Sequence, residues 1–409
     1  MVIKNLILAR TIILDTLKRN YLLAVIACLM ILPFSIVLVN DQLRGNLAKD
    51  EQCYVGVAFC GNTTAEAKNL IDRVKGYTNL FVLQSGPVSD SEVLTTEICD
   101  YAANAGLDII VYFGDLSQRI LEEKNMLWRI SWVKNAKDRY AEKFLGIYMY
   151  DEPGGISLDY NWTEEDIFPR NATLADLTYD SIANRYIYGF QVSDQGFRTA
   201  KTYSDNVFVS DYGLYWFDYK AGYDVVWAQV GWNHTLEQDI ALARGAAKMQ
   251  DKSWGSMITW KYDEPPYLDS GEAVFEQMLI SYKCGAEYIV IFNYPTFEDK
   301  DFGVLTEEHF GALERFWNEI VQGSDYAQGT IVGDVALVLP KNYGWGMRHP
   351  LDRIWGWFGP DELSPQIWDL SRSLLATYEF DLDIIYDDNL ALDNTYKKYF
   401  FWNGTTITP

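Results

Sequence analysis

Short apolar runs alternate with longer amphipathic stretches from residue 53 to residue 321, and this alternation restricts the possible folds more than any other feature of the sequence. The runs have the length of buried strands, and the stretches between them show the apolar spacing of helices. Repeated β-α units of this kind build a parallel sheet covered by helices. Eight of the runs are predicted as strands: Tyr54–Phe59, Leu80–Leu83, Asp108–Phe113, Phe144–Tyr150, Val207–Ser210, Val225–Val230, Ser256–Lys261 and Tyr288–Phe292.

Predicted helices lie where such a sheet needs its crossovers. Thr63 precedes Glu66, and Ser91 precedes Glu92, which are typical sequences for the start of a helix. Eight strands with crossovers over roughly 250 residues predict an α/β fold of the TIM (β/α)8 barrel type, assigned to residues 53–321. The alternative is an open doubly wound sheet, but no glycine-rich phosphate loop follows the first strand. The predicted helices include Thr64–Lys75, Ser91–Ala105, Leu236–Gln250, Gly271–Cys284 and Thr306–Val321, with the fourth crossover supplied by Leu174–Thr202.

A second, smaller unit is predicted after the barrel. Residues 322–329 carry no motif and are predicted to be a linker. Residues 330–409 then show a strand, helix, strand pattern without a nucleotide-binding fingerprint, which predicts a small flavodoxin-like β-α-β accessory lobe. Its elements are expected at Val332–Leu339, Ile367–Phe380, Leu382–Tyr386 and Tyr399–Trp402, with a loop rich in Trp and Gly at Lys341–Pro365.

An almost uninterrupted apolar run spans Tyr21–Val39, about the length needed to cross roughly 30 Å of hydrocarbon as a helix. Basic residues precede the run, and by the positive-inside rule they place the N-terminus in the cytoplasm. We therefore expect a single-pass anchor in the cell membrane at residues 21–39, a cytoplasmic segment at 1–20, a linker at 40–52, and the remaining chain outside the cell. A cleaved signal peptide is the alternative. The basic residues are Lys4, Arg10, Lys18 and Arg19.

An outside location gives two further expectations. Asn-x-Ser/Thr sequons are glycosylation acceptors in an exported chain, and five begin at Asn62, Asn161, Asn171, Asn233 and Asn403. The four cysteines after the apolar run match no zinc or redox spacing, and they either include a disulfide or are buried thiols: Cys53, Cys60, Cys99 and Cys284.

Composition excludes several classes of function. The net charge of −23 argues against nucleic acid, because phosphate binding needs clusters of Lys and Arg. His234, His309 and His349 have no ligand spacing, so neither a metal site nor a cofactor is predicted. The sequence contains no Gly-x-Ser-x-Gly elbow, which argues against a serine esterase. Aromatic residues make up 15% of the chain, and flat rings that carry one polar atom suit sugar faces as well as core packing.

The tetrapeptide Tyr-Asp-Glu-Pro occurs twice, at residues 150–153 and 262–265, and each copy follows a predicted strand. Proline after Glu152 or Glu264 stops the strand ladder and fixes the backbone of the turn. The fourth and seventh strands lie on roughly opposite sides of an eight-stranded ring, so acids at their ends can point into one pocket at the C-terminal rim. For a single copy, the alternative is a strand-to-helix turn in which Asp caps the next helix and Glu lies in its first turn.

With these motifs the chain resembles the large clan of retaining TIM-barrel glycoside hydrolases, in which the acid/base Glu ends the fourth strand in Asn-Glu-Pro and the nucleophile Glu ends the seventh. The resemblance implies that Glu152 is the acid/base, that Glu264 is the nucleophile, and that the chain cleaves a glycan or polysaccharide. Asp151 stands where the clan has Asn. The alternative is a glycan-binding or cell-envelope surface protein that keeps the barrel without catalysis.

The distance between the two carboxyl groups determines the stereochemical outcome. A gap of about 5 to 5.5 Å implies retention, whereas roughly 6.5 to 9.5 Å leaves room for a water molecule and implies inversion. Asp151 and Asp263 add negative charge that raises the pKa of one partner, and Lys261 either counters this charge or forms an ordinary salt bridge. The substrate-binding candidates on the same rim are Asp151, Asp263, Lys261, Tyr262, Asp211, Tyr212, Gln229, Trp232, Asn293 and Tyr294.

Overall fold

The computed structural model describes residues 53–160, 162, 177–232, 234–294, 302–388 and 395–409, and the chain from Cys53 to Pro409 forms one compact unit. The predicted anchor at residues 21–39, its flanking segments 1–20 and 40–52, and three sequon asparagines, Asn161, Asn171 and Asn233, lie outside the described residues. Within the described ranges, no helix has both the length and the apolar character needed to cross a membrane.

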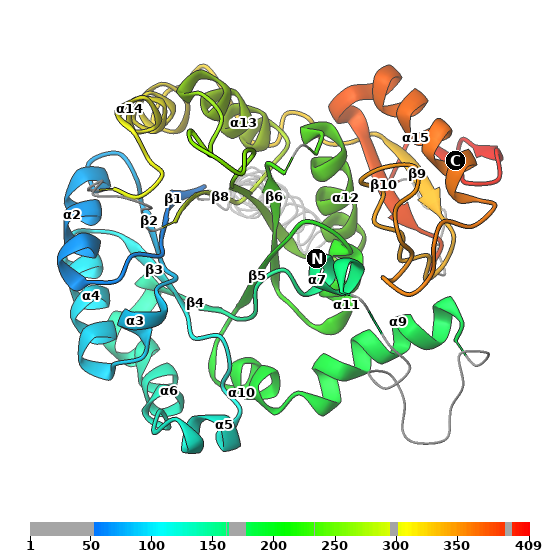
Figure 1. Ribbon diagram of the computed structural model, residues 1–409. Coiled ribbons are helices and arrows are strands. Elements are labelled where there is room, and N and C mark those ends of the chain that lie inside the picture. The colour runs from blue at the N-terminus through cyan, green and yellow to red at the C-terminus, as the bar shows by residue number, and fades with distance from the viewer. Residues whose placement is uncertain (1–52, 161, 163–176, 233, 295–301, 389–394) are drawn as a thin grey trace, which may run out of the picture. The chain divides into compact units, whose positions relative to one another are not determined.

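Eight parallel strands close into a barrel in chain order, which confirms the predicted barrel (Figure 1). The last strand pairs with the first, and Tyr54 lies opposite Tyr288 in this closing pair. The strands are β1 (Tyr54–Phe59), β2 (Leu80–Leu83), β3 (Asp108–Tyr112), β4 (Phe144–Tyr148), β5 (Val207–Asp211), β6 (Val225–Val230), β7 (Ser253–Ile258) and β8 (Tyr288–Asn293).

The strand bounds agree with the sequence prediction to within two residues except at β7, which runs three residues earlier than the predicted Ser256–Lys261. Thr259 still donates its backbone N–H to Val230 O at 2.8 Å. The chain then turns away, because the backbone N–H groups of Lys261 and Tyr262 both donate to Tyr267 O, at 2.8 and 3.0 Å. Residues 261–267 are therefore a turn closed on itself, and not the end of a strand.

Helices surround the barrel on the outside (Figure 1). Two of them begin as the sequence predicts, because Thr63 and Glu66 form a capping box at α2 and Ser91 caps α4. The predicted fourth crossover is two helices, α9 and α10, joined by the π-helical segment η3 (Gly189–Ser193). The described barrel helices are α2 (Thr64–Val74), α3 (Gly86–Ser89), α4 (Glu92–Asn104), α5 (Gln118–Glu123), α6 (Trp128–Tyr140), α7 (Pro153–Asp159), α9 (Tyr179–Tyr188), α10 (Gln195–Tyr203), α11 (Tyr215–Ala221), α12 (Leu236–Met249), α13 (Gly271–Lys283) and α14 (Glu307–Phe316), with short helical segments η1 (Ala141–Lys143) and η4 (Trp317–Val321).

Large rings fill the barrel interior below its C-terminal mouth. Trp227 contacts both Tyr148 and Phe208, with ring centroids 5.4 and 5.3 Å apart, and Phe208 also contacts Tyr288 at 5.2 Å. A separate apolar layer lies between the strands and the helices, so both faces of each strand are covered, and this explains why the strands appear as continuous apolar runs. The interior is a packed core, and a ligand of the barrel must therefore bind at its mouth.

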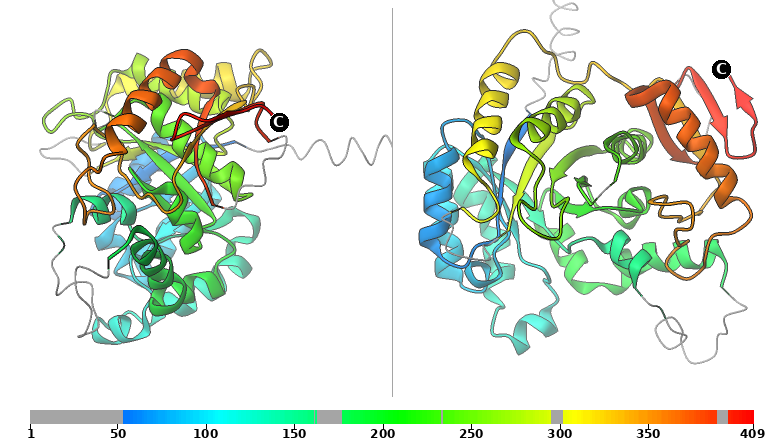
Figure 2. Two further views of the ribbon diagram at one scale, coloured as in Figure 1. Left: turned by 90° about the vertical axis from the view of Figure 1, so that its right-hand side faces the viewer. Right: turned by 45° about the horizontal axis from the view of Figure 1, so that its top comes forward.

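The C-terminal residues form a small mixed sheet beside the barrel (Figure 2). Its strand order is β10-β9-β11-β12; the first three strands are parallel and β12, which the sequence did not predict, is antiparallel. The elements are β9 (Val335–Leu339), α15 (Ser364–Tyr378), η5 (Glu379–Asp381), β10 (Leu382–Tyr386), β11 (Lys398–Phe401) and β12 (Thr406–Ile407).

A buried ion pair fixes this sheet to the barrel helix α12. Arg244 Nε donates to Asp383 Oδ1 at 2.7 Å, and its other nitrogens donate to the carbonyls of Ile331 and Phe380 at 2.9 and 2.6 Å. The Asp383 side chain is fully buried. The small sheet is therefore held on the barrel by a buried charged pair, and removal of either partner would leave the other buried without its main counter-charge.

The four described cysteines are free thiols, so of the two alternatives for these cysteines the structure has the thiols and no disulfide between them. Cys53, Cys99 and Cys284 are buried, and Cys60 lies at the mouth directly after β1. Burial raises the pKa of each thiol, so none of them is poised as a thiolate.

Candidate active site

The first Tyr-Asp-Glu-Pro copy forms a strained turn at the C-terminal end of β4. Tyr150 and Glu152 both adopt left-handed backbone conformations, with φ values of 62° and 54°. Such values are uncommon for residues other than glycine, and they persist only where the surroundings hold them in place. Glu152 N donates to Ser210 O at 3.0 Å, which ties the turn to the end of β5. The carboxyl groups of Asp151 and Glu152 are thus presented by a rigid segment.

Helix α7 follows this turn, and its first amides are capped by Asp211 from β5. Gly154 N donates to Asp211 Oδ2 at 2.5 Å, and Gly155 N donates to Oδ1 at 2.7 Å. Glu152 occupies the N-cap position of α7 but makes no side-chain bond to the helix. The simple capping turn, with Asp151 as the cap, is therefore not what forms here, and the Glu152 carboxyl is left for other contacts.

Asp151 is held by two hydroxyl groups. Tyr148 OH and Ser210 Oγ both donate to Asp151 Oδ1, the second at 3.0 Å, and the two hydroxyl oxygens lie 2.7 Å apart. Burial raises the pKa of Asp151, while these two hydrogen bonds favour its ionised form. Neither hydroxyl was singled out from the sequence, although Ser210 and Tyr148 are polar residues inside apolar runs.

Glu152 is half-buried and belongs to the same hydrogen-bonded cluster. Gln229 Nε2 donates to Glu152 Oε1 at 2.7 Å and to Ser210 Oγ at 3.1 Å, so one amide connects the two acidic side chains. Trp232 Nε1 donates to Gln229 Oε1 at 2.7 Å and fixes the orientation of that amide. Burial, followed by the negative charge of Asp151, raises the pKa of Glu152 to about 7. Glu152 can therefore carry a proton near neutral pH.

Asp211 and Tyr212, two of the predicted substrate-binding residues, lie behind this cluster. Asp211 is fully buried, and its oxygens also accept the backbone N–H groups of Tyr212 and Gly213 at 2.8 and 3.1 Å. Burial raises the pKa of Asp211, and the charge of Glu152 adds to this rise. Tyr212 OH donates to Asp159 Oδ2 at 2.8 Å, at the far end of α7. Both residues position α7 and the turn before it.

Aromatic rings line the mouth at the ends of β6, β7 and β8. Trp232 and Trp260 have ring centroids 6.1 Å apart, and Trp260 meets Tyr294 edge to face at 4.9 Å. Trp232 and Tyr294 are more than one-third exposed. Asn293, at the end of β8, is buried, and its Oδ1 has no hydrogen-bond partner among the described residues. The sequence prediction missed Trp260 because it placed that residue inside β7.

The second Tyr-Asp-Glu-Pro copy is built differently from the first. It lies in the turn at residues 261–267, and the side chains of Tyr262, Asp263 and Glu264 are exposed. Lys261 Nζ donates to Asp269 Oδ2 at 3.0 Å, and Tyr262 OH donates to Asp269 Oδ1 at 3.2 Å. Glu264 lies six residues beyond the end of β7 at Ile258, and within the described ranges no hydrogen bond joins its side chain to the cluster around Glu152. The two copies do not form one described cluster.

Tyr112, at the end of β3, and Cys60, directly after β1, border Asp151 at the mouth. The pKa of Tyr112 is raised to about 12 by burial and then by the charges of Asp151 and Cys60. Tyr112 also meets Tyr148 with ring centroids 5.1 Å apart.

Among the residues that the structure describes, no group of three or more His, Cys, Asp or Glu side chains is arranged to hold a metal ion. The site therefore consists of one acidic pair, its hydroxyl and amide partners, and an aromatic rim.

No protein-family model matches the sequence, and no curated protein matches it. Solved structures with a similar fold include a β-mannanase from the blue mussel Mytilus edulis, with a TM-score of 0.40, 9% identity, and coverage of 68% of this chain and 94% of that one. An exo-β-1,4-mannosidase from Opitutaceae bacterium strain TAV5 has a TM-score of 0.45 and 11% identity, and the match covers 82% of this chain and 70% of that one. A 3-deoxy-D-arabino-heptulosonate 7-phosphate synthase from Thermotoga maritima matches with a TM-score of 0.36 and 9% identity over 66% of this chain and 87% of that one. All three TM-scores lie below 0.5.

Proposed function

We propose that this chain is a glycoside hydrolase in which Glu152 acts as the general acid. The observation that carries the proposal is the Glu152 carboxyl itself, which lies on a strained turn at the barrel mouth with its pKa raised to about 7. Cleavage of a glycosidic bond needs a protonated acid beside the leaving oxygen, and an acid with a pKa near the working pH serves this step best. The aromatic rim of Trp232, Trp260 and Tyr294 supplies flat faces for sugar rings.

Asp151 is proposed as the second carboxylate. It is joined to Glu152 through Ser210 and Gln229, and its negative charge lies where it can stabilise the oxocarbenium-like transition state. The resemblance instead implies Glu264 as nucleophile. The exposed turn that carries Glu264 favours Asp151 over this alternative. A Glu264→Gln variant distinguishes the two, because it retains most activity if Asp151 is the partner and loses it if Glu264 attacks the sugar.

The membrane placement belongs to the same proposal. The apolar run at residues 21–39 and the basic residues before it support a single-pass anchor with the barrel outside the cell. In this arrangement residues 53–321 form the catalytic domain and residues 330–409 an accessory lobe, for which we propose a flavodoxin-like fold. Protease treatment of intact cells tests the orientation: an external protease should remove the barrel, whereas full protection would contradict an outside location.

The direct test of the function is release of reducing ends from a panel of polysaccharides by the full chain. Glu152→Gln is expected to lower this release by about a hundredfold or more, the usual contribution of a general acid. Glu276→Gln, on the exposed face of α13, is the matched control and should leave the rate unchanged. Equal rates for the Glu152 variant and the wild type would refute the assignment.

A non-catalytic glycan-binding surface protein is the second candidate. The observation in its favour is that the Glu264 side chain is exposed. The acidic cluster described at the mouth then consists of Asp151 and Glu152, which are neighbours in the sequence, and lacks a carboxylate that faces them from the opposite side. Binding of a polysaccharide without any release of reducing ends would favour this candidate. Binding with release that depends on Glu152 would favour the enzyme.

A further inference from the structure

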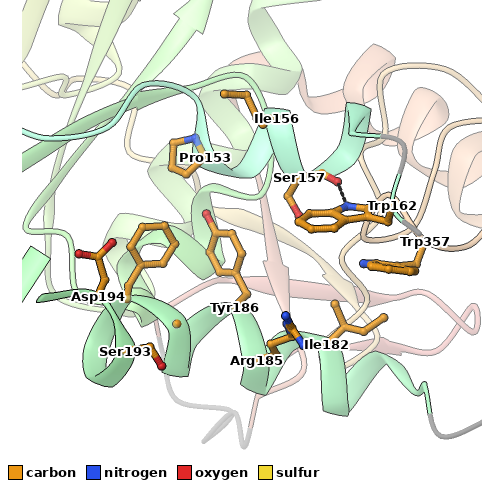
Figure 3. A pocket seen from close by; sticks show the side chains of 12 residues that line it. Pro153, Ile156, Ser157, Trp162, Ile182, Arg185, Tyr186, Ser193, Asp194 and Trp357 are labelled. Carbon is orange, nitrogen blue, oxygen red and sulfur yellow. Dashed lines mark hydrogen bonds between the residues drawn. The ribbon is translucent and has the colours of Figure 1, made fainter. Parts of the chain in front are cut away.

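An open groove of about 500 Å³ runs beside the turn that carries Glu152, between α7 on one side and α9 with η3 on the other (Figure 3). Pro153, which directly follows Glu152, and Asp194 lie at one end of the groove, and Trp162 and Trp357 lie at the other. Helix α7 has seven residues and is therefore about 10 Å long. The groove leads away from the candidate acid along this helix.

The far end of the groove is a pair of stacked indole rings. Trp162 and Trp357 have ring centroids 5.3 Å apart and planes inclined by 22°. Trp162 Nε1 donates to Ser157 O at 2.7 Å, so its ring is fixed on the end of α7. Trp357 belongs to the loop between β9 and α15 of the C-terminal lobe. The lobe therefore supplies one wall of a groove that begins at the barrel mouth.

The loop that carries Trp357 is held on α9 by several hydrogen bonds. Tyr179 OH donates to Asp361 Oδ2 at 2.9 Å, and Tyr343 OH donates to Asp361 Oδ1 at 2.6 Å. Asn342 Nδ2 donates to Asp180 Oδ1 at 2.6 Å. The bonds from Tyr179 and to Asp180 join the lobe to the opposite wall of the groove, and the bond from Tyr343 holds Asp361 within the loop, so the position of the indole pair is set before any ligand binds.

The groove combines apolar and polar groups. Ile156 is 49% exposed on the groove side of α7, and the Tyr186 and Phe190 rings lie opposite. Arg185 and Asp194 add charged groups of opposite sign to the lining. Tyr150 OH donates to Asp194 Oδ2 at 2.5 Å, which links the near end of the groove to the residue before Asp151. Flat rings with a few fixed polar groups are the surroundings that a sugar chain needs, because each pyranose has apolar faces and a polar edge.

We propose that this groove binds successive sugar rings of an oligosaccharide, with Trp357 of the C-terminal lobe as the stacking platform at its far end. The inference rests on the proposed function, and it specifies the substrate as a glycan chain of several sugars. The lobe is then part of substrate binding. A groove of this length makes affinity depend on the length of the chain, because a short ligand at the mouth cannot reach Trp357.

Binding to the full-length Glu152→Gln chain tests the inference, because this variant should consume the probe about a hundredfold or more slowly. The probes are linear hexasaccharides of glucose, mannose, xylose and N-acetylglucosamine, the corresponding disaccharides, and octyl glucoside, each followed by calorimetry. At least one hexasaccharide is expected to bind at least about tenfold more tightly than its disaccharide. Adding Trp357→Ala should weaken that hexasaccharide by about tenfold or more, as loss of a well-packed tryptophan does. Trp357→Phe, which keeps a ring, should restore most of the affinity.

Trp402→Ala is the matched control, because Trp402 is a half-buried tryptophan of the same lobe outside the groove. It should bind the hexasaccharide like the parent chain. The inference is overturned if no hexasaccharide binds, if Trp357→Ala leaves the affinity unchanged, or if octyl glucoside binds more tightly than every hexasaccharide, which would mean an apolar aglycone site. Length-dependent binding that needs Trp357 in a chain without hydrolytic activity would support the groove and refute the enzyme, so the two failures are distinct.

Discussion

Replacing Asp151 by Asn tests how the site prepares its acid. Burial and the charge of Asp151 together raise the pKa of Glu152 from 4.5 to about 7. Burial is the larger cause, and removing the charge of Asp151 should lower the pKa of Glu152 by roughly one unit, the order of effect of a neighbouring charge. The Asn side chain keeps an oxygen that accepts from Tyr148 and Ser210, and the geometry of the turn is therefore preserved. The substitution also removes the proposed second carboxylate, so most of the rate should be lost, and the pH dependence is measured on the activity that remains.

The assay is the pH dependence of kcat/KM, which reports the pKa values of the free enzyme. Glu152 must be protonated to act, so activity should fall on the alkaline side with a midpoint near pH 7 in the wild type. Without the charge of Asp151 the pKa of Glu152 falls, and the midpoint of the Asp151→Asn variant should move to about pH 6. Asp263→Asn, at the same place in the exposed second copy, should leave the midpoint unchanged. An unchanged midpoint for Asp151→Asn, or one moved to higher pH, would refute the reasoning.

Three further predictions concern stability. The pKa of Glu152 in the folded chain lies above its unfolded value of about 4.5, so the folded state binds an extra proton between pH 4.5 and 7 and loses stability as the pH rises through this range. Glu152→Gln has no such charge to bury and should stabilise the chain by about 2 to 3 kcal/mol at pH 8, measured by urea unfolding. Below about pH 4.5 it should give no gain. Arg244→Ala leaves buried Asp383 with only the more distant Lys248, 3.7 Å away, as counter-charge and should cost about 3 kcal/mol, so a loss below about 1 kcal/mol would contradict the buried pair. In Gly155→Ala the new Cβ would lie 2.2 to 2.4 Å from ring atoms of Tyr212, so the variant should lose about 1 to 3 kcal/mol and most of its activity. Gly311→Ala, on the exposed side of α14, should lose neither, because its Cβ meets nothing within 4 Å.

The barrel could be predicted from the sequence because its strands are covered on both faces. A strand such as Leu80–Leu83 is then apolar at every position, and its ends are marked by polar residues and glycine. β7 was placed three residues late for a local reason. The apolar run continues through Thr259 and Trp260, which lie at the mouth, while Ser253 is a polar residue that belongs to the strand. Hydrophobic pattern alone cannot separate the last strand residue from an aromatic residue of the rim.

The candidate acid could be predicted from the sequence, whereas its hydrogen bonds could not. Glu152 is marked by the proline that follows it and by its place after the fourth strand. Its partners, Ser210 and Gln229, come from strands more than fifty residues away, and only the closure of the barrel brings them to Glu152. The same limit applies to the repeated motif. The identical residues at 262–265 form an exposed turn, and among the described residues no side chain donates to Asp263 or Glu264 as Tyr148 and Ser210 donate to Asp151.

The role of the C-terminal lobe could not be read from the sequence at all. Trp357 lies nearly two hundred residues after Trp162, yet their rings stack. Nothing in the spacing of either residue indicates this contact. It follows from the ion pair of Arg244 with Asp383 and from the bonds between α9 and the lobe, which together fix the lobe beside α7.

The most direct test of the central claim compares two leaving groups in the Glu152→Gln variant. The leaving oxygen of an ordinary oligosaccharide needs a proton. A dinitrophenyl glycoside of the same sugar does not, because its leaving group, dinitrophenolate, departs as a stable anion. If Glu152 is the general acid, cleavage of the oligosaccharide should fall about 10² to 10⁴-fold while cleavage of the dinitrophenyl glycoside falls far less. An equal loss on both substrates, or no loss on either, would contradict the claim.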